Sequence, residues 1–287
     1  MEKKVILITG ASSGIGYSAA RILSQQGHKV YGAARRVELM EPLREFGLVP
    51  VKLDVTDENS IREAVKTVIE AEGRIDVLVN NAGYGSFGPI ESVPEQEARM
   101  QMEVNVFGLA AMIRCVLPYM RERHGGRIIN ISSIAGKLVL PYGGWYHVSK
   151  YSVEALSDAL RIELKQFGIK VSIIEPGGIK TPWGTIAAEH LEKTCEGTVY
   201  EDEGGQMARF LRKGYATNFL SSPDVIGRAI ARAANARRPK TRYRTGRIAG
   251  TAVFVHSIIP ARWWDALMKF SVKNLYNLAR RVDEASS

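Results

Sequence analysis

The sequence predicts a three-layer α/β fold: a doubly wound parallel sheet of the Rossmann type with a helical lid and a C-terminal extension. Two observations predict it. Short apolar runs alternate with longer segments of helical period through the first 180 residues, and the first run leads directly into a glycine-rich turn. Strands and helices that alternate with short connections require right-handed crossovers, which build a parallel sheet. We expect one catalytic domain over residues 1–250 and a helical extension over residues 251–287.

Six apolar runs predict the strands of the sheet. They are nearly continuous in valine, isoleucine and leucine, which is typical of strands buried on both faces. The expected strands are Val5–Thr9, Lys29–Ala34, Val49–Leu53, Ile75–Asn80, Arg127–Ser132 and Lys170–Glu175. The segments between them have an amphipathic helical period and are the expected helices: Ile15–Gln26, Ser60–Glu72, Pro94–Arg123 and Trp145–Phe167.

The alternation stops after Thr181. Residues 183–222 are polar, rich in glycine and acidic around Glu196–Glu203, and they contain no clear strand. A long segment of this kind in a compact domain is typically a lid or a binding element. We therefore expect a helical lid there, followed by a helix over residues 223–236 and a final strand over Arg242–Thr245.

Composition indicates a globular protein, because 45% of the 287 residues are hydrophobic and 24% are charged. It excludes a disordered chain, a collagen and a small disulfide-bonded scaffold. Cys115 and Cys195 are too few for a disulfide framework or a cysteine zinc site, and no metal is expected. The opening apolar run, Val5–Ile8, is shorter than a secretory signal requires, so a cytoplasmic location is expected.

The formal net charge of +9 is unevenly distributed. Residues 207–287 hold 16 lysines and arginines against 4 acidic residues, whereas residues 1–206 hold 23 against 26. No zinc-finger spacing or RNA-binding motif accompanies this surplus, so a nucleic-acid partner is not expected. Two interpretations stay open: a solvated or subunit-facing surface, and a surface that associates with an anionic membrane.

The C-terminal extension allows the same two interpretations. Residues 248–260 are uncharged but too short to span a bilayer. The residues that follow have the spacing of an amphipathic helix, which either covers the core or a neighbouring subunit, or lies on a membrane surface. Its apolar positions are Trp264, Leu267, Met268, Leu275, Leu278 and Val282, and its basic ones are Arg262, Lys269, Lys273, Arg280 and Arg281.

The first strand runs into the turn TGASSGIG, residues 9–16, at the start of a helix. Glycines allow backbone amides to approach a pyrophosphate at a helix N-terminus, where the peptide dipoles favour negative charge. The spacing differs from the G-x-G-x-x-G of ordinary dinucleotide-binding domains. We expect this turn to hold a dinucleotide through Gly10, Ser12, Ser13, Gly14, Ile15 and Gly16.

The end of the second strand predicts which dinucleotide is bound. Ala34 stands where an acid would bind the adenosine ribose of NAD, and Arg35 and Arg36 follow it. Guanidinium groups suit a 2′-phosphate, so NADP is favoured over NAD, although exposed arginines without this role are the alternative. Asp54, followed by Val55, is placed to meet the adenine; the alternative is that Asp54 caps the next helix.

Tyr146 and Lys150 are four residues apart and share one face of a helix. The ammonium is expected to lower the pKa of the phenol from its usual value of about 10, which prepares it to exchange a proton with an alcohol or a carbonyl oxygen. Ser133 lies 13 residues before Tyr146, at the end of the fifth strand, where such sheets place reactive groups. His147 points roughly 100° around the helix from Tyr146 and is expected to be structural.

In family order, the segments TGASSGIG, LDV, NNAG, NVFG, NISS, YHVSK and PGGIKT resemble those of the classical short-chain dehydrogenase/reductase family over roughly residues 4–182. The segment NNAGYGSFGPIE, Glu175 and the C-terminal extension resemble the branch of the 17β-hydroxysteroid and retinol dehydrogenases. The resemblance implies an NADP-dependent oxidoreductase that transfers a hydride to or from a CH–OH or C=O carbon, and a homodimer or homotetramer.

The resemblance also implies a role for each matching residue. Tyr146 would be the general acid/base, and Lys150 would lower its pKa and bind the nicotinamide ribose. Ser133 would hold the substrate oxygen, and Asn105 would anchor a water that relays protons from Lys150. The remaining cofactor contacts would come from Asn81, Ala82, Gly83, Pro176, Gly177, Ile179 and Thr181.

The residues expected around the reactive centre, beside Ser133, are apolar or aromatic. With no arginine or lysine among them to bind a carboxylate or phosphate, they favour a steroid-, retinoid- or aliphatic-ketone-like substrate. Plain core packing is the alternative for each aromatic side chain. These residues are Tyr84, Phe87, Leu140, Tyr142, Trp145 and Trp183.

Two other functions stay open from the sequence. The first is an NADP-binding sensor that has lost catalysis, against which the intact set of Asn105, Ser133, Tyr146 and Lys150 argues. The second is a membrane-surface binding protein that uses residues 261–282, a role that is compatible with catalysis.

Overall fold

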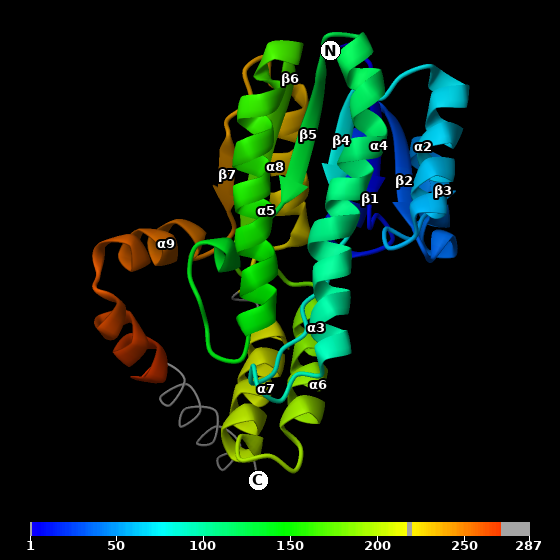
Figure 1. Cartoon of the computed structure of the whole chain (residues 1–287). Helices are drawn as coiled ribbons and strands as arrows, with labels where there is room; N and C mark the ends of the chain where they lie inside the picture. The colour runs from blue at the N-terminus through cyan, green and yellow to red at the C-terminus, as the bar shows by residue number, and fades with distance from the viewer. Residues whose placement is uncertain (1, 217–219, 271–287) are drawn as a thin grey trace.

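The computed structural model describes residues 2–216 and 220–270. Seven parallel strands form one sheet in the order β3-β2-β1-β4-β5-β6-β7, with helices on both faces (Figure 1). This confirms the predicted doubly wound α/β fold. The strands are β1 (Val5–Thr9), β2 (Lys29–Ala34), β3 (Val49–Lys52), β4 (Val77–Asn80), β5 (Gly126–Ile131), β6 (Ile169–Pro176) and β7 (Arg242–Thr245).

Each strand lies within two residues of its predicted bounds, because apolar runs of this kind are buried on both faces of the sheet. The chain leaves β1 toward β2 on one side and returns as β4 on the other. The carboxyl ends of β1 and β4 therefore meet at the topological switch point, where doubly wound sheets bind their ligands.

The helices that cover the sheet differ from the predicted ones in two places. The predicted helix over residues 94–123 contains a π-helical turn, η2 (Glu103–Gly108), between α3 (Glu95–Met102) and α4 (Leu109–Glu122). A 3₁₀ helix, η1 (Val37–Phe46), fills a connection that had no assignment. The others are α1 (Gly14–Gln25), α2 (Glu58–Glu72), η3 (Ile134–Gly136), α5 (Gly144–Glu163), η4 (Leu164–Phe167) and α8 (Pro223–Asn235).

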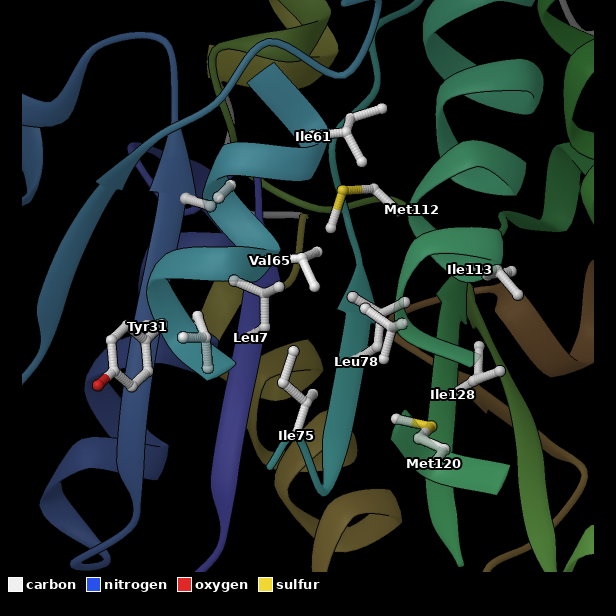
Figure 2. Packing of buried hydrophobic residues seen from close by; sticks show 14 of the residues in the cluster. Leu7, Tyr31, Ile61, Val65, Ile75, Leu78, Met112, Ile113, Met120 and Ile128 are labelled. Carbon is white, nitrogen blue, oxygen red and sulfur yellow. The ribbon is translucent and has the colours of Figure 1, made fainter. Parts of the chain in front are cut away.

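Two hydrophobic clusters hold these layers together, one on each face of the sheet. On one face, α2, α4 and α5 pack against the strands, as Figure 2 shows for Val65 of α2, Met112 of α4 and Leu78 of β4. On the other face, α1, η1 and α8 enclose a second cluster that includes Leu23 and Ile230.

The continuous helix Glu95–Glu122 is long and apolar enough to cross a membrane by length and composition alone. Its apolar side, however, supplies Leu109, Met112 and Val116 to the cluster against the sheet. We therefore interpret it as a core helix of the domain.

Residues 183–222 contain two helices, α6 (Trp183–Cys195) and α7 (Glu201–Ala216). They pack together beyond one end of the sheet, beside the first turns of α5 (Figure 1). The sequence analysis expected a helical lid in this segment, and the structure has two helices there.

The extension begins with α9 (Ala249–Ile258), and residues 261–270 are also helical. Trp264 and Met268 pack with Val253 and Leu138, so this part of the segment covers the protein. The expectations for Leu275, Leu278, Val282, Lys273, Arg280 and Arg281 fall outside the described residues.

Strand β7 is joined to the sheet by buried ion pairs. Glu175 of β6, to which the sequence assigned no role, is fully buried between Arg242 (3.1 Å) and Arg244 (2.8 Å). Arg242 also reaches Glu154 and Asp158 of α5, at 3.1 and 2.6 Å. Part of the C-terminal basic surplus is therefore structural, since these buried carboxylates require cationic partners.

The packing in Figure 2 leads to a prediction for stability. Leu78→Ala removes a fully buried side chain from the sheet and should lower the free energy of unfolding by about 2–5 kcal/mol. Leu39→Ala makes the same change at a side chain that is 42% exposed and should cost less than about 1 kcal/mol. Urea unfolding followed by circular dichroism measures both, and equal losses would contradict this assignment of the core.

Candidate active site

The glycine-rich turn after β1 is fixed to the end of β4 by hydrogen bonds. The hydroxyl of Thr9 accepts hydrogen bonds from the backbone N–H groups of Asn81 and Ala82, both at 3.0 Å. The side-chain amide of Asn81 donates to the carbonyls of Thr9 (3.0 Å) and Gly10 (3.1 Å). Asn81 therefore shapes the turn, and the cofactor contact expected for it stays a prediction.

The turn has no room for side chains at its glycines. A Cβ atom on Gly16 would lie 2.3 Å from the carbonyl oxygen of Gly10, and Gly10 itself has a positive φ of 67°. Gly14 faces Thr181, whose Cγ2 would lie 3.3 Å from an added Cβ. The glycine-rich turn and the PGGIKT segment thus meet at one place.

The N-terminus of α1 fits a bound phosphate. Its N-cap residue, Ser13, makes no side-chain hydrogen bond to the first turn of the helix. The first backbone N–H groups of a helix have no partner within the helix itself, and an anion satisfies them well. Ser12, Ser13 and Ile15 lie in this same turn, so the residues present fit the phosphates of a dinucleotide.

The adenosine end of the expected site lies beyond β2 and β3. Arg35 and Arg36 are both exposed there. The carboxylate of Asp54 accepts hydrogen bonds from the backbone N–H and the hydroxyl of Thr56. Burial alone would raise the pKa of Asp54, but these bonds and the nearby Arg35 lower it overall. Asp57, not Asp54, caps α2, which rules out the capping alternative. The neighbouring Val55 packs against Gly108 of η2.

The first half of α5 places Tyr146 and Lys150 side by side. The Nζ atom of Lys150 lies 5.8 Å from the centre of the Tyr146 ring and donates to the carbonyl of Ile131 at the end of β5, at 2.9 Å. Both residues are buried, and Ser133 lies near enough to the phenol to affect its pKa. The hydroxyl of the neighbouring Ser132 is buried with no hydrogen-bond partner.

The electrostatics of this pair correct the sequence prediction. Burial raises the pKa of Tyr146 to about 12, and the nearby Ser133 offsets only part of the increase. The expected lowering of the pKa is therefore wrong for the protein alone, because a buried phenolate loses its hydration. Burial likewise lowers the pKa of Lys150 to about 8, although Glu154 opposes this shift.

Asn105 lies in the π-helical turn η2, beside this pair. Its side-chain oxygen accepts from the backbone N–H of Tyr84 (3.0 Å), and its amide donates to the Tyr84 carbonyl (2.9 Å) and the Ser149 hydroxyl (3.0 Å). A Cβ atom on Gly83 would lie 2.9 Å from that oxygen and 3.8 Å from the Nζ of Lys150. Asn105 thus fixes the backbone of Tyr84 close to the Lys150 ammonium. Its role in a water relay stays a prediction.

His147 is structural, as its position on the helix predicts. Its Nε2 accepts from the backbone N–H of Leu140, and its Nδ1 therefore donates to the carbonyl of Ala135, both at 2.9 Å. Burial lowers the pKa of the imidazole, which keeps it neutral. The ring fixes the segment that connects Ser133 to Tyr146.

The last residue of the PGGIKT segment, Thr181, reaches the site. Gly177 packs closely against the carbonyl of Arg247, and its own N–H donates to Thr245 (2.9 Å). Ile179 is buried in the core beneath α1 and α8. Four residues of this segment are expected to contact the cofactor. Among them, Thr181 meets the glycine-rich turn, whereas Pro176 ends β6.

Three of the residues expected around the substrate gather at Tyr146. Its ring centre lies 5.0 Å from that of Trp183 and 6.0 Å from that of Phe87, and Tyr142 packs on the same cluster. The lid completes this cluster. Sequence reasoning missed its members, although the helical spacing of the apolar positions in α6 and α7 could have shown them: Ala187, Ala188, Leu191, Cys195, Met207, Ala208 and Leu211.

The other three expected substrate residues lie elsewhere. Leu140 packs against the C-terminal helices, and the hydroxyl of Tyr84 donates to Glu97 of α3 at 3.1 Å. The indole N–H of Trp145 is buried without a hydrogen-bond partner. The described contacts of these three side chains are therefore with other elements, and their contact with a substrate stays a prediction.

Known proteins share this arrangement. The model of the family described as short chain dehydrogenase matches residues 4–191. A 3-ketodihydrosphingosine reductase from Bacteroides thetaiotaomicron is 40% identical over 86% of this chain and 89% of its own length. Estradiol 17-beta-dehydrogenase 1 from Rattus norvegicus is 36% identical over 85% of this chain and 74% of its own length.

Solved structures agree with the fold. A short-chain dehydrogenase from Streptomyces avermitilis superposes with a TM-score of 0.77 at 31% identity, over 97% of this chain and 98% of that one. The closed form of serine dehydrogenase, complexed with NADP+, superposes with a TM-score of 0.73 at 29% identity, over 85% and 95%. Bound cofactors among the similar structures include both NADP and NADH.

The glycine-rich turn leads to a prediction for nucleotide binding. Gly16→Ala should weaken the affinity for NADPH roughly tenfold or more, because the new Cβ must displace the backbone of the turn. Gly250→Ala is the matched control, since an added Cβ there meets nothing within 4 Å. Fluorescence titration with NADPH measures both affinities, and equal values would show that this turn does not hold the nucleotide.

Proposed function

The chain belongs to the short-chain dehydrogenase/reductase family, and on that premise we propose that it reduces a ketone on an apolar, aliphatic substrate with NADPH. One observation carries the proposal: a protonated phenol, Tyr146, lies buried in an apolar cluster beside Lys150 and near Ser133. Such a group is equipped to bind a carbonyl oxygen and to give it a proton.

The residues divide the work of the reaction among them. NADPH, when bound, supplies the hydride. Ser133 and Tyr146 orient the ketone oxygen through hydrogen bonds, and Tyr146 gives its proton to that oxygen as negative charge develops. The Lys150 ammonium stabilises the phenolate that remains and, with a pKa of about 8, can return a proton to it near neutral pH. Asn105 holds the backbone beside Lys150 in place.

The protonation state of Tyr146 suits reduction. Without bound nucleotide, burial raises its pKa to about 12, so the phenol holds the proton that ketone reduction uses. The relative named 3-ketodihydrosphingosine reductase supports the same direction.

The preference for NADPH is supported by the end of β2. Ala34 supplies no carboxylate to bind the ribose hydroxyls, and the exposed guanidinium groups of Arg35 and Arg36 suit a phosphate. The similar serine dehydrogenase structure also holds NADP+.

The substrate class is supported by the surroundings of Tyr146. Phe87, Trp183 and the lid enclose it with apolar side chains. The relative named 3-ketodihydrosphingosine reductase favours a long aliphatic ketone. The relative named estradiol 17-beta-dehydrogenase makes a steroid ketone the second candidate.

The mechanism predicts that Tyr146→Phe loses at least about a hundredfold in turnover, because the proton donor is gone. Its affinity for NADPH should stay unchanged. Tyr151→Phe, the same change at an exposed position of α5, should leave both quantities unchanged. NADPH consumption across aliphatic and steroid ketones measures turnover and identifies the substrate class. Undiminished turnover in Tyr146→Phe would remove this mechanism.

The cofactor preference leads to a separate prediction. Arg35→Ala should weaken NADPH binding roughly tenfold or more, because a charge-assisted hydrogen bond to the phosphate is lost, while NADH binding stays unchanged. Arg62→Ala, an exposed arginine of α2, serves as the control. The ratio of the two dissociation constants is the measurement, and an unchanged ratio in Arg35→Ala would contradict the phosphate assignment.

A further inference from the structure

The two C-terminal helices carry an exposed apolar surface that the reaction does not use. On α9, Phe254 and Ile258 are 62% and 63% exposed; on the helix of residues 261–270, Trp263 and Phe270 are 73% and 66% exposed. The two helices pack together through Val253 and Trp264, and exposed apolar side chains of this size on one small unit are uncommon on a monomeric soluble protein and mark an interaction site. We call these four side chains the C-terminal apolar face.

The helix of residues 261–270 has three distinct sides. Trp264 and Met268, four residues apart, form the side that packs on the protein. If the helix only covered the core, the rest of its surface would be polar. Instead, the exposed surface divides into an apolar stripe of Trp263, Leu267 and Phe270 and a charged stripe of Arg262, Asp265 and Lys269.

The C-terminal apolar face is fixed to the active-site segment. Trp264 is 8% exposed, and its indole N–H donates to the carbonyl of Val139 at 3.1 Å. Trp264 also packs with Leu138. Residues 138 and 139 belong to the chain that connects Ser133 to Tyr146. Whatever binds the apolar face therefore lies close to that segment.

The charge around this face indicates its partner. Among the described residues from 246 to 270, Arg247, Arg262 and Lys269 are basic, and Asp265 is the single acidic residue. Unlike Arg242 and Arg244 of β7, which are held by buried carboxylates, Arg262 and Lys269 lie on exposed helical surface. Basic side chains beside exposed aromatic ones match an anionic lipid surface. A second copy of this chain would instead bring two basic segments together.

We propose that the C-terminal apolar face is a docking surface for an anionic phospholipid bilayer. The two helices lie in the membrane interface, since α9 has 10 residues, too few to span a hydrocarbon core of about 30 Å. Docking brings the segment between Ser133 and Tyr146 to the lipid, where apolar molecules dissolve. This proposal rests on the surface alone and not on the proposed reductase activity.

Co-sedimentation of the full chain with vesicles tests the proposal. The protein should bind vesicles that contain phosphatidylglycerol, bind pure phosphatidylcholine vesicles weakly, and dissociate as salt is added. Trp263→Ser and Lys269→Glu should each weaken binding at least about fivefold. Each variant has a matched control. Ile162→Ser changes a side chain that is 70% exposed on α5. Lys66→Glu changes an exposed lysine of α2, which lies at the opposite edge of the molecule from α9 (Figure 1).

Three outcomes would overturn the proposal: no binding to anionic vesicles, equal loss in the control variants, or self-association that Trp263→Ser abolishes in the absence of lipid. The last outcome, seen by light scattering, would assign the face to a second copy of the chain. Binding of NADPH by every variant shows that each is folded. Reduction of a water-soluble ketone is measured separately, so failure of the reductase assignment is distinguishable from failure of membrane docking.

Discussion

The active site depends on one constraint: the ammonium of Lys150 is buried beside Tyr146 and is held by the carbonyl of Ile131 at 2.9 Å. A buried cation is costly unless it is hydrogen-bonded, so this contact fixes the lysine at the carboxyl end of β5. The same burial shifts the two pKa values in opposite directions, to about 12 for the phenol and about 8 for the ammonium. The phenol of Tyr146 thereby keeps its proton, and after that proton has been transferred to the substrate, Lys150 can supply another.

The rest of the fold supports this pair. The sheet order brings the ends of β1 and β4 together, where Thr9 and Asn81 shape the turn that fits a dinucleotide. The π-helical turn η2 aims Asn105 at the backbone next to Lys150, in the position where such turns frequently serve a site. The lid helices then close apolar side chains over the phenol, which is the source of its burial.

Much of this could be predicted from the sequence, and the exceptions have physical causes. Continuous apolar runs fixed the strands, and the spacing of Tyr146 and Lys150 placed both on one face of α5. The bounds of the two lid helices could not be predicted, because Gly204 and Gly205 disfavour a helix and packing of α7 against α6 overrides that preference. The turn η2 depends on contacts between Asn105 and residues distant in the chain. Burial depth, which sets the pKa of Tyr146, cannot be obtained from local spacing.

The pH dependence of ketone reduction at saturating NADPH tests the central claim most directly. If the Lys150 ammonium supports proton transfer, the rate should fall as one proton is lost with an apparent pKa near 8, while Tyr146 remains protonated. A rate that stays constant between about pH 6 and pH 10 would show that the buried lysine does not take part.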